Sequence, residues 1–180
     1  MPTTELYSRF TEPILNALQY QGSSNDCGPY ITATLLNAIQ HLEIDPTELA
    51  RQMNKPNRRG WKLVVRRIPN WATFPWGITD VLKANGMAAE WHVCSTSTAL
   101  TETLREDRLG LVISGTWQPL RSHAMLLVGW HYRKGWGFAN TQKRNREIDW
   151  IDEINFQKQW RAMGRIRIEV KDIKGGHCEF

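Results

Sequence analysis

The sequence predicts an α+β fold in which helices come first and an antiparallel sheet follows. Apolar residues recur at steps of three and four between 27 and 42, as on one face of a helix, and they alternate at 165–170, as in a strand. Short apolar runs near 124–128 and 135–140 have the length of buried strands. No repeat or linker divides the 180 residues, so one domain is expected over 1–180, with its core at about 15–170 and a tail at 171–180.

Helices account for most of the predicted structure in the first half of the chain. The longest begins at Cys27, because Asp26 suits an N-cap and Pro29 falls in the first turn, where its missing N–H costs nothing. Pro13 is expected to interrupt the first helix, and Asp45 to cap the third. The predicted helical ranges in this half are 12–18, 27–42, 46–53 and 79–84.

Strands dominate the second half. A polar turn at 131–134 joins two apolar runs closely enough to make them an antiparallel hairpin. In the last strand Ile166, Ile168 and Val170 share one face, and charged residues occupy the other. The predicted strands are 88–94, 111–116, 124–128, 135–140 and 165–170, with helices at 98–108 and 152–160.

The composition excludes several classes of protein. Three cysteines without paired spacing argue against a disulfide framework and favour a reducing compartment, so a cytoplasmic location is expected. No zinc-ligand spacing, signal peptide or apolar run of about 20 residues is found, so neither a metal nor a membrane span is expected. The formal charge of +5 includes a basic run at 55–67. Such a run is most often a solvated face, although it can attract acidic peptides, anionic lipid or, as the least favoured partner, nucleic acid.

Cys27 is the candidate nucleophile. A helix N-terminus offers partial positive charge and free N–H groups, both of which favour a thiolate. Gly28 follows and leaves room for a substrate backbone, whereas a capping Asp26 would compete with the thiolate for the same field. By itself, a cysteine on a helix face is usually a packing residue.

A base and its orienting partner are expected from the hairpin. His123 opens one strand and Asn140 closes the other, so an antiparallel pairing puts them at the same end. The Asn140 amide can then accept the His123 N–H and direct the other ring nitrogen to the sulfur of Cys27. Gln21, six residues before Cys27, can supply an oxyanion hole together with the Cys27 backbone N–H.

These segments resemble a known family. The stretch from Gln21 to Pro29, QGSSNDCGP, resembles the Gln-x5-Cys-Gly motif of papain-like cysteine peptidases, and its Asp-Cys-Gly core looks most like the C39 family of double-glycine leader peptidases. The segments HAMLLVG, from His123, and GWGFAN, ending at Asn140, are similar to the strands that carry the family's other two triad residues. The resemblance covers about residues 15–170. It implies a papain-like fold and a bacterial, free-standing thiol peptidase that needs no cofactor.

Two departures limit what the resemblance implies. The third triad residue of C39 peptidases is usually Asp followed by Pro, whereas this chain has Asn140-Thr141, as papain has Asn. The exporter domains of the leader peptidases are also missing, so a leader-peptide substrate does not follow. Hydrolysis of a peptide or protein through a thioester is therefore the expected reaction. A catalytically silent domain that binds a peptide or leader, and an acyltransferase or deamidase using the same site, stay open as alternatives.

The sequence also suggests where a substrate would lie. The basic, Trp-rich segment 57–76 is the expected groove wall, with Gly28, Trp61 and Trp76 as substrate-binding residues and an acidic or extended peptide as the substrate. A Gly-Gly pair at Gly175-Gly176 raises the hypothesis of self-cleavage in the tail, which two glycines of a flexible terminus explain equally well. The oligomeric state is not predicted.

Overall fold

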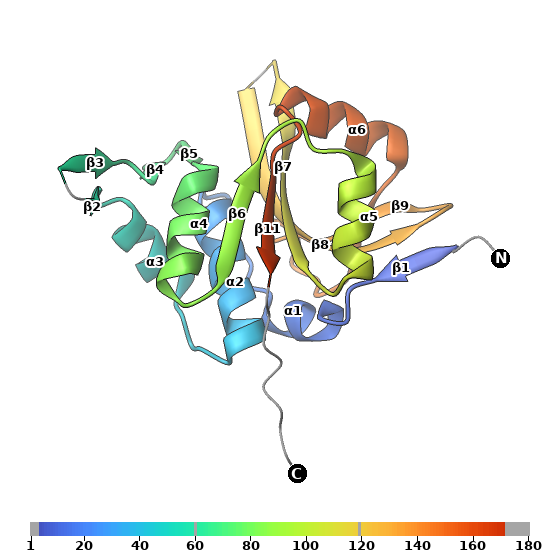
Figure 1. The fold of residues 1–180 in the computed structure, drawn as a ribbon, viewed down its shortest axis with the longest axis horizontal. Coiled ribbons are helices and arrows are strands. Elements are labelled where there is room, and N and C mark those ends of the chain that lie inside the picture. Colours follow the sequence, from blue (N-terminus) through green and yellow to red (C-terminus); the bar gives the residue numbers. More distant parts are fainter. Residues whose placement is uncertain (1–3, 60, 119, 172–180) are drawn as a thin grey trace, which may run out of the picture.

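A computed structural model describes residues 4–59, 61–118 and 120–171. The Gly175-Gly176 pair and Cys178 lie outside the described residues. Figure 1 shows a central sheet with helices packed around it. In chain order, the elements are β1 (Glu5–Tyr7), α1 (Thr11–Ala17), α2 (Cys27–Gln40), α3 (Pro46–Met53), β2 (Asn57–Arg59), β3 (Lys62–Val64), β4 (Arg67–Ile68), β5 (Ala72–Thr73), α4 (Pro75–Ala84), β6 (Ala88–His92), α5 (Ser97–Arg105), β7 (Leu109–Trp117), β8 (Leu120–His131), β9 (Gly135–Ala139), β10 (Asp149–Ile151), α6 (Glu153–Ala162) and β11 (Arg167–Lys171).

The predicted α+β class is confirmed, and the main sheet is antiparallel throughout. Its strands run in the order β10-β9-β8-β7-β11-β6, and β1 pairs with β8. β8 is the longest strand of the described chain and joins its neighbours through two hairpins, β7–β8 and β8–β9. Two small hairpins, β2–β3 and β4–β5, stand apart from the main sheet.

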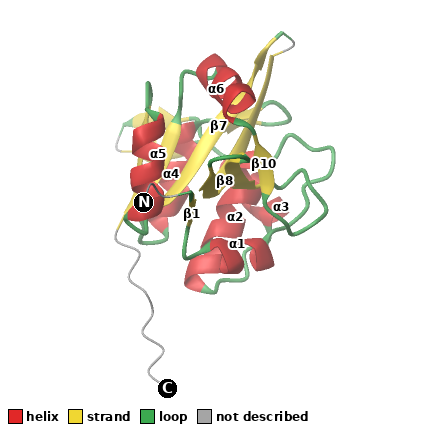
Figure 2. Cartoon of the chain, turned by 90° about the vertical axis from the view of Figure 1, so that its right-hand side faces the viewer, coloured by secondary structure: helices red, strands yellow, loops and turns green. Residues whose placement is uncertain are grey.

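Both faces of the sheet are covered. In β7 and β8 successive side chains alternate between two apolar clusters, one packed with α1–α4 and the other with α5 and α6. Ala124 and Leu126 belong to the first cluster, and Met125 and Leu127 to the second. Figure 2 shows this arrangement with the sheet between α2 and α5. The prediction of N-terminal helices on one face is therefore incomplete, because α5 and α6 cover the other.

Three local predictions were wrong. The side chain of Asp26, at the N-cap position of α2, makes no cap hydrogen bond and pairs with Arg67. Pro13 does not interrupt α1, because it occupies the first turn, where no intrahelical N–H is needed. The fourth helix begins at Pro75 rather than at residue 79, again with proline in the first turn.

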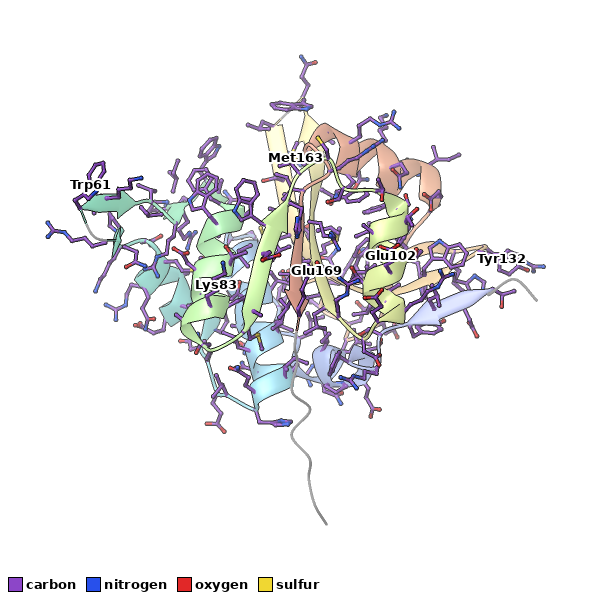
Figure 3. The ribbon with its side chains drawn as sticks, in the orientation of Figure 1. Trp61, Lys83, Glu102, Tyr132, Met163 and Glu169 are labelled. Carbon is purple, nitrogen blue, oxygen red and sulfur yellow. The ribbon has the colours of Figure 1, made fainter. Side chains whose placement is uncertain are left out.

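The alternation in β11 is present, but its charged face is not solvated. Glu169 is 2% exposed and accepts hydrogen bonds from Arg108, at 2.5 Å, and Arg167, at 3.0 Å. Arg167 also donates to the hydroxyl of Thr103 on α5. The charged face is thus buried under α5 as a paired network, in which Nε of Arg108 and Nε of Arg167 have no hydrogen-bond partner among the described residues. Glu169 is labelled near the centre of Figure 3.

Candidate active site

The structure places Cys27 against β8, the strand that carries His123. Cys27 is the first residue of α2, and hydrogen bonds from the backbone of Ala124, the residue after His123, and of Gly28 lower the pKa of its thiol. Burial acts more strongly in the opposite direction, and the net effect is a raised Cys27 pKa. The thiol is therefore the stable form of this side chain around neutral pH.

His123 is held by one ring nitrogen only. Its Nε2 lies 2.7 Å from Oδ1 of Asn140, whereas its buried Nδ1 has no hydrogen-bond partner among the described residues. Because a carbonyl oxygen only accepts hydrogen bonds, Nε2 carries the proton in the neutral ring and Nδ1 has the free lone pair. In this tautomer, His123 can accept a proton at Nδ1.

The Asn140 amide cannot turn round without losing bonds. Its Oδ1 also accepts the backbone N–H of Gln142, at 2.9 Å, and its Nδ2 donates to Oδ2 of Asp149, at 2.6 Å. A flipped amide would set NH₂ against an N–H donor and a carbonyl oxygen against a carboxylate. Asp149 therefore fixes the orientation in which Asn140 faces His123.

Asp149 is the residue that sequence reasoning missed. It lies on β10, which pairs with β9 so that Asp149 stands opposite Phe138, two residues before Asn140. Its carboxylate also lies 3.6 Å from the ammonium of Lys143. Burial lowers the pKa of His123, while the bond to Asn140 and the charge of Asp149 raise it in part. No motif in the sequence relates residue 149 to residue 123, so only the pairing of β10 with β9 reveals that Asp149 contacts Asn140 and acts on His123.

Gln21 is fixed at the edge of the same site. Its Nε2 donates to the carbonyl of Ser24, at 2.8 Å, and its Oε1 accepts from the hydroxyl of Thr141. The second hydrogen of that amide is left for a ligand, and the N–H of Cys27, the first residue of the helix, has no intrahelical partner. Gln21 and Cys27 line one cavity of about 30 Å³. Both donors thus belong to residues of one cavity, and an oxyanion requires hydrogen-bond donors of this kind.

The β4–β5 hairpin closes this cavity from the other side. The buried Arg67 of β4 pairs with Asp26, and Nδ2 of Asn25 donates to the carbonyl of Asn70 at 2.7 Å. Both bonds tie the hairpin to the segment that leads into α2. Trp71 and residues 72–73 then line the cavity beside Cys27.

Gly28 allows this close approach. A Cβ on Gly28 would lie 2.4 Å from Cβ of Thr73, far inside contact distance. Gly28→Ala is therefore expected to push the hairpin away and to lower the free energy of unfolding by about 1–3 kcal/mol. Urea denaturation measures the change. The double variant with Thr73→Gly should recover most of the loss, and equal losses with and without Thr73→Gly would contradict the proposed contact.

The two tryptophans named from the sequence do not reach this site. Trp61 is 91% exposed at the far end of the β2–β3 hairpin, as Figure 3 shows, and lines neither the Cys27 cavity nor the groove beside His123. Trp76 lines neither of them, because it stacks on Phe74 and donates to the carbonyl of Val65. Among the tryptophans of segment 57–76, Trp71 is the one that lines the Cys27 cavity.

The described part of the chain holds neither a candidate metal centre nor a membrane-spanning helix. Over residues 4–59, 61–118 and 120–171, no three His, Cys, Asp or Glu side chains come together as they would around a metal ion. None of the helices in these ranges has the length and apolar character needed to cross a bilayer.

Comparisons with known proteins support the fold. No family model and no curated protein matches the chain by sequence. Its structure is similar to the crystal structure of a protein from Bacillus anthracis described as a "putative C39-like peptidase", with a TM-score of 0.69. The two are 13% identical, and the match covers 94% of this chain and 98% of the other. At this identity the likeness shows a shared fold, which confirms the resemblance to C39 peptidases at the level of architecture.

Proposed function

We propose that this protein is a cysteine hydrolase of peptide or protein substrates, with Cys27 as nucleophile, His123 as general base and acid, and Asn140 as the residue that orients His123. One observation carries the proposal. Asn140 fixes the His123 ring at Nε2, and Nδ1 of His123 is unpaired among the described residues. The next residue along the strand, Ala124, hydrogen-bonds the sulfur of Cys27 through its backbone.

The reaction would proceed through a thioester. Nδ1 of His123 takes the thiol proton as the sulfur of Cys27 attacks the substrate carbonyl, and the oxyanion is stabilised by the Gln21 side chain and the Cys27 N–H. The imidazolium then gives its proton to the leaving amine, and the C–N bond breaks. His123 next deprotonates a water molecule, which releases the acid from the thioester and restores the thiol.

Burial shapes the acid–base behaviour of this pair. It raises the pKa of Cys27 and lowers that of His123, so both groups are neutral in the resting protein. The proton would therefore move in step with attack, not before it. Activity should begin where His123 loses its proton, below the ordinary histidine pKa, and should decline where Cys27 ionises, above the ordinary cysteine pKa.

Cleavage of a proteome-derived peptide library tests the proposal. Wild-type protein should generate new peptide N-termini, and Cys27→Ala should generate none. Tight binding of peptides by both proteins without any cleavage would favour the alternative of a silent binding domain. Release of ammonia from glutamine side chains, or transfer of an acyl group to an added amine, would identify the deamidase or acyltransferase alternative.

Trp71 is proposed to form the substrate wall beside Cys27. It is 56% exposed and lines the Cys27 cavity, so Trp71→Ala should raise KM several-fold with little change in kcat. Trp61→Ala provides the comparison and should raise KM less. The reverse ranking would favour Trp61 as the wall residue that the sequence predicted.

A further inference from the structure

A second and larger cavity begins at His123. It is a groove of about 590 Å³ between the ends of β7 and β8, the segment after β9, β10 and α6. Ser122 and Gln142 line both this groove and the Cys27 cavity, so the two are contiguous. Cys27 lines only the small cavity, and His123 lines only the groove. The nucleophile and the base therefore face different parts of a bound substrate.

The chemistry of the proposed function indicates which portion of the substrate binds in the Cys27 cavity and which binds in the groove. The acyl portion of the substrate becomes bonded to Cys27, whereas the leaving amine must reach His123 to receive its proton. The residues on the amine side of the scissile bond therefore enter the groove. This assignment rests on the proposed function.

The groove is positively charged. Residues 108–146 contain seven Lys or Arg and no Asp or Glu, and two of these cations, Arg121 and Lys143, line the groove. Arg121 is exposed at the groove and forms no ion pair with any residue in the described ranges. Asp149 is the acidic residue among the lining side chains, and its carboxylate already binds Asn140 and Lys143. The Arg121 guanidinium thus faces the leaving-group side with its charge available to a substrate.

We propose that this groove selects substrates with acidic residues on the amine side of the scissile bond, and that Arg121 binds their carboxylates. A guanidinium presents paired donors that match a carboxylate, and an extended peptide can bring one side chain to it. The amides of Gln118, Gln142 and Gln159, which also line the groove, provide donors and acceptors for the peptide backbone.

Peptide binding to the Cys27→Ala protein tests this without requiring turnover. The probes are two fluorescein-labelled hexapeptides, one with two glutamates and the other with two lysines at the same positions. Their binding is measured by fluorescence anisotropy at low salt. The acidic probe should bind about tenfold more tightly than the basic one, and added salt should reduce the difference. Adding Arg121→Glu should weaken acidic binding about tenfold, and Arg121→Gln by a smaller factor.

Arg146→Glu is the matched control. Arg146 is exposed in the same acid-free segment but does not line the groove, so the same charge reversal there should change binding less than about twofold. Equal affinity for the two probes, or equal losses from Arg121→Glu and Arg146→Glu, would overturn the proposal. Thermal unfolding of each variant checks that the fold is kept. Failure of the proposed function itself would show separately, as absence of library cleavage by the wild-type protein.

Discussion

Replacement of His123 by alanine is expected to abolish peptide hydrolysis while leaving the fold intact. The side chain hydrogen-bonds Asn140 and lies at the edge of the groove rather than in either apolar cluster. Without it, the thiol loses the base that would take its proton, and the raised pKa of Cys27 keeps the thiolate scarce at neutral pH. Loss of one member of a nucleophile–base pair costs roughly 10⁶-fold in kcat.

The measurement is the rate of library cleavage by wild-type, His123→Ala and His131→Ala proteins at equal concentration. His131 ends the same strand, β8, at the opposite end from the site, and serves as the matched control. Circular dichroism and thermal unfolding should be similar for all three. Cleavage by His123→Ala at a rate near that of the wild type would exclude His123 as the base.

Replacement of Asp149 by asparagine is expected to lower the pKa of His123 and to slow hydrolysis by about tenfold. The asparagine oxygen can still accept the Asn140 N–H, so geometry is kept while the negative charge is removed. That charge raises the pKa of His123, so its loss moves the pKa further below the ordinary histidine value. The acid limb of kcat/KM should shift to lower pH, and kcat should fall because the imidazolium formed during reaction is less stabilised.

The His123 ring-proton resonances, followed by NMR against pH, report this pKa without any substrate. Lys143→Gln is the informative counterpart, because it removes the cation 3.6 Å from Asp149. Without the Lys143 cation, the negative charge of Asp149 is less compensated, so the pKa of His123 should rise. This shift is opposite to the one expected for Asp149→Asn. A titration that neither substitution moves would show that Asp149 does not act on His123 electrostatically.

The local features of the site followed from the sequence because they depend on neighbours in the chain. The 3.6-residue periodicity and Pro29 placed Cys27 at the start of a helix, and this is where α2 begins. A tight turn between two apolar runs placed His123 and Asn140 at one end of a hairpin, and their side chains are in contact. Hairpin register is fixed by the turn, so this contact was predictable.

The features that were missed depend on residues far apart in the sequence. Asp26 was expected to cap α2, but the buried Arg67, 41 positions later, offers a charge that outweighs a cap hydrogen bond. Trp71 rather than Trp61 or Trp76 lines the Cys27 cavity because the β4–β5 hairpin packs on Gly28, a contact that composition cannot indicate.

The sequence by itself determined the order of the elements, the helix start at Cys27 and the pairing of His123 with Asn140, since periodicity and turn chemistry act locally. Only the tertiary structure decided that Asp149 fixes the Asn140 amide, that the charged face of β11 is buried under α5, and that Arg121 lines the groove beside His123. These depend on strand order and on which charges find partners when the sheet forms. Such pairings join residues through space, and no local pattern in the chain specifies them.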